Sequence, residues 1–593
     1  MEQMKKRLLS GNHCAKLCII IQICLFIACK PSNHPRLLFS ANDVSVLKMK
    51  AESPEGIAII AQLRRRLAIA PDPLLTGSYA AGHGFLYLLF GQEEDRQASM
   101  DYTEKVLRDE IPYISTQEEF IDKPMPLWNS NFKAIYRAQP ILSIALAYDI
   151  CFNFWPDDFR TKVAMELEDK LKKLLNGGGV GWNENPWSNW HGITKGAGGV
   201  AALAILGDKG ISNDIDAYID KARKELLLHL SYLGDKGWTP EGFDYLRFEL
   251  CSGVLPFVQC YKQVKGIDLS DSASNIQWFM PFYVMQSVVH DKGVIKVPDY
   301  GPCGVDWNTN RWRSGDFVMG MGVSDKKYIP AILWTFNKAF GLQGDSTFNI
   351  FKPHDAIFAL VNYPQNIISK NPSTVLSHVW IDEKAGTCII RNHWQDENDI
   401  VFAVTGNALA RRASHSHREA GSFRLLGLGS TWASRGIKTP KVRNEFLENT
   451  VLVDKATNWR GTAIESFSID SSADLKVVLR YNMKEVYVGG NGVAESIYVG
   501  VDKASRTFIV HLNDSSAKIT IADSITGGGE RLWKMHGRVK FVVRENKNVQ
   551  AINQNGNQCL VEFPVDCKLL ISVDSTCIKA KGKNNFVVNI ALY

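Results

Sequence analysis

The stretch from Arg137 to Phe152, RAQPILSIALAYDICF, carries its apolar residues in a helical rhythm and decides how the first half of the chain folds. The same rhythm returns in later segments, and breakers rich in Gly, Pro and Asp separate them. These segments are Phe159–Leu175, Gly198–Leu206, Ile215–Leu233 and Leu246–Val264. Because helices joined by short loops are antiparallel neighbours, we expect roughly ten helices between about residue 40 and about residue 350, stacked in a ring or an arc.

The pattern changes after Lys352, where short β-forming runs replace the helical segments. Turn residues such as Gly489–Gly492 and Gly527–Gly529 lie between the runs. The runs are Thr387–Arg391, Ile400–Val404, Val451–Val453, Leu475–Leu479, Ser496–Val501, Thr507–Leu512, Lys518–Ile521, Val539–Val543 and Phe586–Ile590. Many short strands of this kind predict stacked antiparallel sheets. The fold class is therefore multidomain α+β, with a linker at about residues 352–372.

The composition is that of a globular protein, since 45% of the 593 residues are hydrophobic and 22% are charged. These values exclude a disordered tail, a collagen-like fibre and a coiled coil. The net charge is +6, but residues 1–29 hold four basic residues against one acidic residue and so supply half of it. The rest of the chain is too weakly basic to predict a nucleic-acid partner.

Residues 1–29 have the pattern of an export signal. Lys5–Arg7 are basic, and Leu17–Ala28 is apolar except for one glutamine, a run too short to span a membrane. Leu25–Cys29 resembles a degenerate lipobox, in which the cysteine is lipidated. We expect an exported lipoprotein, in the periplasm, in the outer membrane or at the cell surface, that touches the membrane only through a lipid on Cys29. The alternative is an ordinary secretory signal in which Cys29 has no role.

Two polar motifs lie where helices are predicted to start. Asn185–Ile193 (NPWSNWHGI) crowds polar side chains and two tryptophans against a helix N-terminus, which suits anions, while tryptophan faces suit sugar rings. Asp235–Tyr245 (DKGWTPEGFDY) is a loop that enters a helix and ends in an aromatic hydroxyl. Each motif alone also fits a structural role, with Ser188 or Asn189 as a helix cap and Tyr245 in the core.

A third motif, Arg411–Phe423 (RRASHSHREAGSF), gathers two histidines, an acid and three arginines just before a predicted strand. Alternate residues of an extended segment point the same way, so His415 and His417 can share a face. This density of ionisable groups favours a functional role over that of a solvated loop.

Taken together, the motifs resemble the bacterial heparinase II/III-like polysaccharide lyase family, in its lipoprotein form. His34–Phe39 (HPRLLF) resembles the opening segment of that family, and Gly386–Arg391 (GTCIIR) resembles the first strand of its β domain. The most specific match is His415–His417 followed by Ala420–Phe423. The resemblance implies an incomplete α/α toroid over residues 30–355, an antiparallel β-sandwich over residues 356–593, and an active site in the cleft between them.

The resemblance also implies a reaction, the β-elimination of a uronic acid in an acidic, glycosaminoglycan-like polysaccharide such as heparan sulfate, hyaluronan or chondroitin. The proton alpha to the uronate carboxylate is removable only if that carboxylate is neutralised and the developing charge is stabilised. The candidates for this role are Asn189 and His191. The candidates for substrate binding are Trp190, Glu241, Arg411 and Arg412.

A base must take the proton from C5, and an acid must protonate the leaving oxygen. Tyr245 can be the base if nearby cations lower its pKa from about 10, and His415 can be the base with an ordinary pKa of about 6.5. The residues leave open which of the two is the base and which is the acid. No organic cofactor is required.

Many relatives hold a metal with the second histidine of the His-x-His pair, an aspartate about one strand later, and a further histidine. His417 stands at the first of these positions, but Ser434 and Glu448 stand at the other two. Serine is a poor zinc ligand, and one histidine with one glutamate is fewer than the usual set. We expect His417 to bond Glu448 or Glu419 without a metal; the alternative is a zinc ion held by His417 with Glu448.

Two other functions stay open at this stage. A glycan-binding surface lipoprotein without catalysis fits the lipobox and the tryptophans, but it gives no reason for Tyr245 and the His-x-His motif. A glycoside hydrolase on a helical toroid needs two carboxylates in a cleft, and Glu241, Asp244 and Glu249 are available. The histidines and arginines would then lack a role. The loop Gly301–Arg313, rich in Trp, Asn and Arg, is a candidate for substrate subsites.

Overall fold

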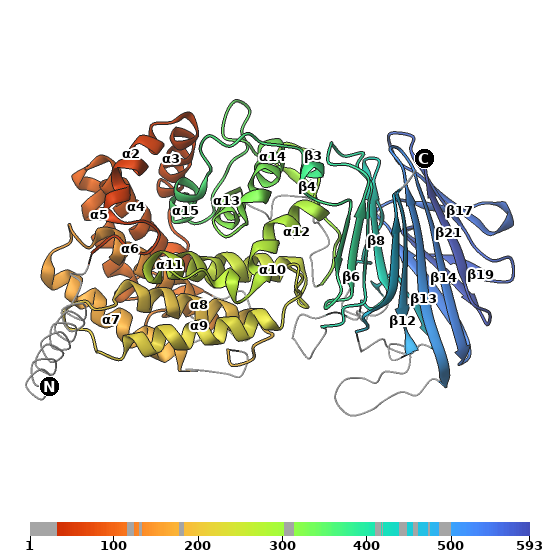
Figure 1. Cartoon of the computed structure of the whole chain (residues 1–593), viewed down its shortest axis with the longest axis horizontal. Helices are drawn as coiled ribbons and strands as arrows, with labels where there is room; N and C mark the ends of the chain where they lie inside the picture. Colours follow the sequence, from red (N-terminus) through yellow and green to blue (C-terminus); the bar gives the residue numbers. More distant parts are fainter. Residues whose placement is uncertain are drawn as a thin grey trace, which may run out of the picture.

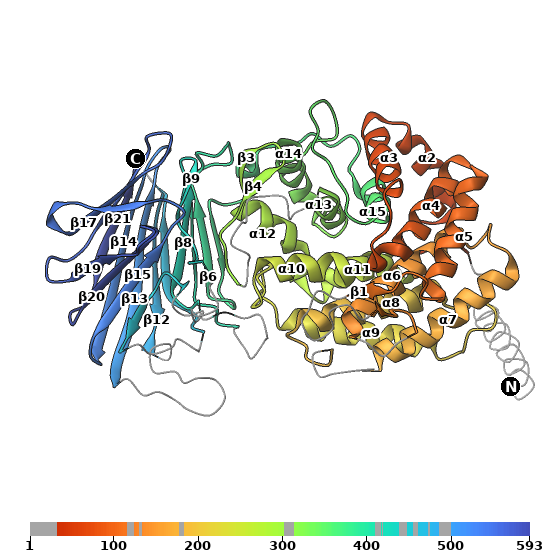
Figure 2. The same cartoon turned by 180° about the vertical axis from the view of Figure 1, so that it is seen from behind.

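The computed structural model describes residues 33–114, 124–129, 133–176, 183–301, 314–409, 417, 419–437, 447–454, 461–471, 475–484 and 500–593. Within these residues, helices dominate as far as residue 362, and antiparallel strands follow from residue 379. Figure 1 shows the two parts side by side, and the reverse view in Figure 2 shows the same arrangement. The predicted order of a helical part followed by a β part is confirmed.

The helical part alternates buried helices with half-exposed ones. The buried helices, which hide nearly all of their residues, are α4 (Thr76–Phe90), α6 (Ala134–Cys151) and α8 (Asn189–Ala204). The half-exposed helices, which carry charged residues on one face, are α5 (Glu93–Leu107), α7 (Asp157–Leu175) and α9 (Ile215–Ser231). Each half-exposed helix packs against a buried one, so this region is two helical layers deep.

The other helices complete the helical part. They are α2 (Val44–Ala51), α3 (Pro54–Leu67), α10 (Phe243–Glu249), α11 (Leu255–Lys265), α12 (Phe279–Gln286), α13 (Ser314–Met321), α14 (Ile329–Ala339) and α15 (Asp355–Asn362). In both views α10 and α12 lie at the end of the helical part that faces the sheets (Figures 1 and 2). Of the helices in the described residues, none combines the length and the apolar character needed to cross a membrane.

The segment predicted as one helix over Leu246–Val264 is interrupted in the structure. A π-helical turn over Leu250–Val254 separates α10 from α11. Gly253 in this turn packs closely against α8, where a Cβ on Gly196 would lie 2.3 Å from the Gly253 carbonyl oxygen. Such turns are rare and often lie at functional sites. A single extra residue in a turn leaves the apolar rhythm almost unchanged, which is why the sequence did not reveal it.

The β part consists of three antiparallel sheets in the described residues. The first sheet has the order β5 (Val379–Asp382), β6 (Thr387–Arg391), β7 (Val401–Thr405), β8 (Ser422–Gly427), β9 (Ser430–Ala433). The second has the order β11 (Ile464–Asp470), β12 (Leu475–Asn482), β13 (Val501–Leu512), β14 (Ala517–Gly527), β21 (Val587–Leu592), β18 (Gln558–Glu562), β17 (Asn548–Ile552), β16 (Phe541–Val543). The third has the order β10 (Val451–Val453), β15 (Arg531–His536), β20 (Cys577–Gly582), β19 (Lys568–Ile571).

The first sheet is buried on both faces and joins the two parts. In β6, Ile389 belongs to the core of the helical part, whereas Ile390 belongs to the core of the other sheets. In β7, Val401 and Ala403 face the helical core, and Phe402 faces the opposite one. Because successive side chains of a strand point to opposite faces, this sheet is the layer through which the helices and the remaining sheets meet.

One boundary and two short strand pairs differ from the sequence prediction. The linker expected at about residues 352–372 starts too early, because Asp355–Asn362 forms α15, which packs on α3 and α13. The helical part also contains two short antiparallel strand pairs, β1 (Tyr113–Ile114) with β2 (Pro124–Met125) and β3 (Val288–Asp291) with β4 (Val294–Lys296). Strands this short cannot show a recognisable alternation, so the sequence did not predict them.

Candidate functional site

The start of α8 presents a buried amide that has no hydrogen-bond partner among the residues that the structure describes. Ser188 caps the helix, since its hydroxyl accepts a hydrogen bond from the Trp190 backbone N–H at 3.3 Å. The side chain of Asn189 is buried, and within the described residues neither its Oδ1 nor its Nδ2 atom has a partner. A buried polar group without a partner costs stability, and in a native protein it needs an explanation. We take it as a candidate ligand-binding group.

Glu241 connects this helix start to the second motif. Its buried carboxylate accepts a hydrogen bond from the Asn189 backbone N–H at 3.0 Å. The free N–H groups and the dipole of a helix start stabilise such a carboxylate. Glu241 therefore fills the anion position that the sequence suggested for a substrate, and it holds the loop before α10 against α8.

His191 lies on the same turn as Asn189 but is used differently. Its Nδ1 atom is 2.8 Å from the Asn183 carbonyl oxygen, and its Nε2 atom is 3.2 Å from the Glu225 carbonyl oxygen. Burial, together with the neighbouring His229, lowers the pKa of His191 to about 3. A neutral imidazole has a single N–H, which donates to one of these carbonyls and so holds the helix start in place, and Nε2 also lies 3.3 Å from a Glu225 carboxylate oxygen. The geometry therefore favours Asn189 over His191 as the group that meets a substrate.

A buried ion pair behind the helix start was missed by the sequence reasoning. The His229 Nε2 atom contacts the Glu249 carboxylate, and its Nδ1 atom lies 2.6 Å from the Pro186 carbonyl oxygen. Burial disfavours the charged ring, but the Glu249 carboxylate outweighs it and raises the pKa of His229. The pair holds the loop that leads into Asn189. The only signal for it in the sequence is a histidine on the apolar face of a predicted helix.

The His229–Glu249 pair predicts a pH-dependent contribution to stability. Glu249→Gln should lower the Tm by about 2–4 °C at pH 6, because it leaves a buried charge without its partner. Since the folded-state pKa of His229 is raised, the contribution is complete below the unfolded-state value of about 6.5 and is lost as the pH rises through the folded-state value. The Tm difference between wild type and variant, measured by scanning calorimetry, should therefore shrink from pH 6 to pH 9.

The control is Glu397→Gln, which removes the partner of the part-exposed His290 at 2.8 Å. A pair of this kind contributes at most about 1 kcal/mol, so its loss should move the Tm little. A Glu249→Gln difference that stays constant across this pH range would contradict a charged His229.

Tyr245 lies on α10, half-buried, in a group of tyrosines. The ring of Tyr136 on α6 is 5.1 Å from the ring of Tyr113. Burial and the Tyr113 hydroxyl raise the pKa of Tyr136 to about 12, and the nearby Tyr245 adds to this effect. Tyr136 is therefore protonated at neutral pH, and both Tyr136 and Tyr245 are partly exposed. The alternative prediction, that Tyr245 is a core residue, does not agree with its partial exposure.

Gly242, in the loop before α10, packs against Gly301, the first residue of the candidate subsite loop. A Cβ on Gly242 would lie 2.6 Å from the Tyr300 carbonyl oxygen and 2.7 Å from the Gly301 Cα atom. Both glycines have left-handed backbone angles, with φ of +84° and +78°. Only glycine tolerates both the angle and the contact, so this crossing fixes Glu241 and the start of α10 in space.

Five side chains from the β part lie next to the contact between Gly242 and Gly301. We name them the seam cluster: His417, Glu419, Arg424, Arg435 and Glu448. Ligand-type atoms of its histidine and two glutamates lie within 4.8 Å of one another. Glu448 accepts a hydrogen bond from Arg424 Nη2 at 2.7 Å, and its other oxygen lies 3.3 Å from Arg435 Nε. Burial and the nearby Glu448 raise the pKa of Glu419 to about 8. Despite burial, the two guanidiniums hold the pKa of Glu448 below its usual value.

The structure places His417 beside Glu419 and Glu448, the two carboxylates predicted as its partners. His417 Nδ1 lies 3.9 Å from Glu419, which is too far for a hydrogen bond, and the carboxylate of Glu448 faces arginines and the Ser422 hydroxyl. Arg435 directly follows Ser434, the expected ligand position, so the motif does not mark an arginine as a partner of Glu448. Ser434 takes part in a β-bridge to His536.

Several predicted site residues lie outside the described residues, namely Cys29, Arg411, Arg412 and His415. Most of the candidate subsite loop Gly301–Arg313 and the side chain of Asp244 do so too. Trp190 is half-buried against the helical core, and the ring of Trp187 lies 5.3 Å from the ring of Tyr232.

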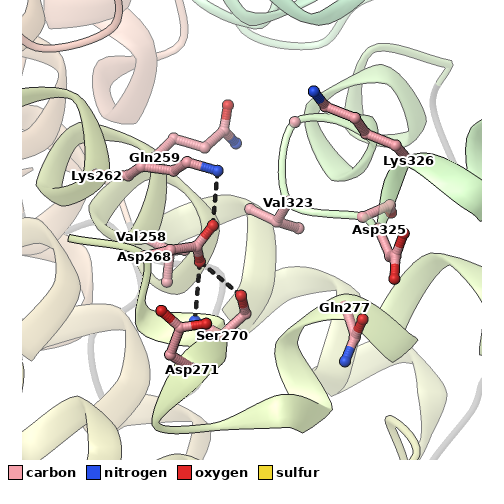
Figure 3. Close-up of a pocket in the computed structure, with 12 residues that line it drawn as sticks. Val258, Gln259, Lys262, Asp268, Ser270, Asp271, Gln277, Val323, Asp325 and Lys326 are labelled. Atoms are coloured by element: carbon pink, nitrogen blue, oxygen red, sulfur yellow. Dashed lines mark hydrogen bonds and ion pairs between the residues drawn. The ribbon is translucent and has the colours of Figure 1, made fainter. Parts of the chain in front are cut away.

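A separate hollow of about 360 Å³ opens on another part of the helical region (Figure 3). It is lined by α11 residues, the segment after α11 and the turn after α13, and no residue of the candidate site lines it. Lys262 and Asp268 pair at 2.6 Å, and Asp268 also accepts hydrogen bonds from Ser270. Because these polar groups bond to one another, the hollow does not present a reactive centre.

The fold, with a double layer of helices followed by antiparallel sheets, is similar to that of solved polysaccharide lyases. Among solved structures, the chain is similar to a heparinase III, with a TM-score of 0.52 and 11% identity over 86% of this chain and 76% of that one. It is also similar to the heparan sulfate lyase HepC from Pedobacter heparinus, with a TM-score of 0.50 and 12% identity over 86% of this chain and 74% of that one.

The structural likeness confirms, at the level of the fold, the resemblance drawn from the sequence motifs. No protein-family model and no curated protein sequence matches the chain.

Proposed function

We propose that the chain is a polysaccharide lyase that cleaves a uronate-containing acidic polysaccharide by β-elimination. Catalysis would take place in a cleft between an incomplete helical toroid and a β-sandwich. The observation that best supports this is the buried Asn189 amide at the start of α8, which has no partner among the described residues and which Glu241 links to the loop that leads into α10 and Tyr245. An enzyme that must bind a carboxylate next to a proton-transfer group needs this combination.

The reaction assigns a task to each group. A base removes the proton from C5 of the uronate, the electron pair forms the C4–C5 double bond, the C4–O bond breaks, and an acid protonates the leaving oxygen. No water is consumed. The Asn189 Nδ2–H groups would donate to the uronate carboxylate, where negative charge builds up in the transition state. Because Asn189 is already desolvated, this interaction would be stronger than in water.

Tyr245 and His415 would share the proton transfers, in the alternatives set out above. Trp190 would contribute a face for a sugar ring, and Arg411 and Arg412 would attract the anionic polymer. We assign His191 and Glu241 supporting roles, because their polar atoms already contact the helix start and the loop before α10.

A panel of polymers tests the proposed function. The purified chain is incubated with heparan sulfate, hyaluronan, chondroitin sulfate and alginate, and the ultraviolet absorbance of the new double bond is followed. We expect the absorbance to rise with at least one of them. New reducing ends without that absorbance would instead indicate hydrolysis, and neither signal on any polymer would support a binding protein.

The hydrolase alternative is disfavoured by the positions of its carboxylates. Glu249 is buried in its pair with His229, and Glu241 bonds the Asn189 backbone N–H. A hydrolase needs one free acid and one free base or nucleophile on opposite sides of the scissile bond. Elimination gives the asparagine and the tyrosine a role that hydrolysis does not.

Export and lipid attachment form a further part of the proposal, and Cys29 tests it. The full chain, expressed with its own signal in a Gram-negative host, should incorporate labelled palmitate and fractionate with membranes. Cys29→Ser should lose the label and appear in the soluble periplasmic fraction. The matched control Cys24→Ser, inside the apolar run, should behave like the wild type. A Cys29→Ser chain that keeps both label and membrane association would contradict the lipobox assignment.

A further inference from the structure

The seam cluster occupies the place where the resemblance to heparinase II/III-like lyases implies a metal. Its histidine, His417, stands at the expected ligand position, and Glu419 and Glu448 bring two more ligand-type side chains within reach. Three such donors could satisfy zinc in number. Whether they suit a cation depends on the charges that surround them.

Those charges do not suit a divalent cation. One oxygen of Glu448 is 2.7 Å from the Arg424 guanidinium, and the other is 3.3 Å from Arg435 Nε. All three side chains are buried, and a guanidinium does not lose its proton in a protein. A divalent ion bound to Glu448 would lie a few ångströms from two fixed positive charges in a medium of low dielectric constant. The donor set therefore does not fit a conventional zinc site.

The two arginines bind the helical part instead. Arg424 Nε donates to Asp299 Oδ1 at 2.6 Å, and the Arg435 backbone N–H donates to the same carboxylate at 2.9 Å. Arg435 Nη1 also donates to the Gly301 carbonyl oxygen at 3.2 Å. The carboxylate of Glu419 accepts a hydrogen bond from the Gly301 backbone N–H. The segment 299–301 is thus held from both sides by the seam cluster.

This segment leads directly to the candidate active site. Gly301 packs against Gly242, which lies between Glu241 and the start of α10. Glu241 bonds the Asn189 backbone N–H, and α10 carries Tyr245. Because Gly242 and Gly301 are in close contact, a displacement of Gly301 would also displace Glu241 and Tyr245.

We propose that the guanidinium of Arg435 takes the place of a metal ion in this chain, so that the seam cluster is a metal-independent clamp that positions the Glu241–Tyr245 loop. Arg435 is a positioning residue: it acts through Gly301 and Gly242. Its effect on catalysis rests on the proposed function, whereas its effects on metal content and stability do not.

The first test is metal content. The purified full chain is incubated with excess zinc, manganese or calcium, passed through a desalting column and analysed by mass spectrometry of the elements. We expect well under one equivalent of each, and a Tm that neither zinc nor EDTA changes. One equivalent of bound zinc, or a Tm that falls in EDTA, would overturn the proposal.

The second test compares variants of Arg435. Arg435→Met keeps much of the volume but removes the charge, and it should lower the Tm by about 2–4 °C because it leaves the buried carboxylates short of one positive charge. It should lower kcat for elimination about 10–100-fold with little change in KM, as the loss of a supporting contact does. Arg435→Lys, which retains the charge, should recover part of both losses. Equal losses in the two variants would show that only shape matters and would overturn the proposal.

Arg538→Ala is the matched control. Arg538 approaches the same Asp299 carboxylate at 3.8 Å, but it is part-exposed and does not reach Glu448. It should leave the Tm and kcat close to the wild-type values, and losses as large as those of Arg435→Met would overturn the special role of Arg435. If no polymer is cleaved but the metal and Tm results hold, the proposed function fails and the clamp stands. If zinc binds and elimination is observed, the clamp fails and the function stands.

Discussion

Replacing Tyr245 with phenylalanine is expected to abolish elimination while leaving the fold intact. In the proposed mechanism the hydroxyl group is either the base that removes the C5 proton or the acid that protonates the leaving oxygen. Loss of a positioned acid or base typically costs about 10²–10⁴ in rate. The ring remains, so its packing beside Tyr136 on α6 is retained. Initial rates from the double-bond absorbance, together with the Tm, measure the two effects separately.

Tyr87→Phe is the control for this prediction. Tyr87 lies on α4 in the same helical part and packs on Phe154, with ring centroids 4.5 Å apart. It should retain full activity. Undiminished elimination by Tyr245→Phe would remove Tyr245 from the mechanism and leave His415 as the remaining candidate for proton transfer.

Replacing Asn189 with alanine should also remove most of the activity, and it should do so without loss of stability. The backbone N–H that bonds Glu241 is kept, and the deleted amide has no partner among the described residues. Deleting a buried polar group that bonds nothing leaves no new orphan, so the Tm should stay the same or rise. Loss of one preorganised donor to a developing charge costs about 10²–10³ in kcat.

The contrast with a surface asparagine makes this prediction specific. Asn213, exposed before α9, provides the control Asn213→Ala, which should change neither Tm nor kcat. If Asn189→Ala instead unfolds at a much lower temperature, the amide has a structural partner, and its assignment as a substrate-binding group is contradicted.

The order of helices and strands could be predicted from the sequence because it depends on the local periodicity of apolar residues. The rhythm of RAQPILSIALAYDICF predicted α6, and the run Thr387–Arg391 predicted β6 residue for residue. The first two motifs likewise located Asn189, Glu241 and Tyr245. The structure adds that Glu241 bonds the backbone of Asn189, a contact between residues far apart in the chain.

What the sequence did not predict are pairings across the fold. His229 and Glu249 lie on different helices, and nothing local marks them as partners. Nothing in the local sequence marks Arg435, because its role depends on contacts with Glu448 and Gly301, which come from other segments. Buried electrostatic networks of this kind are set by tertiary packing, which periodicity does not encode.

The most direct test of the central claim is the fate of solvent oxygen during cleavage. Elimination breaks the C4–O bond without consuming water, whereas hydrolysis adds a water oxygen to a product. A polymer that the chain cleaves is digested in oxygen-18 water, and the products are analysed at once by mass spectrometry. We predict unsaturated uronate ends whose mass is lower by one water than that of the hydrolysis product, with no oxygen-18 incorporated during bond cleavage. Saturated products that carry one oxygen-18 atom for each bond cleaved would contradict the lyase mechanism.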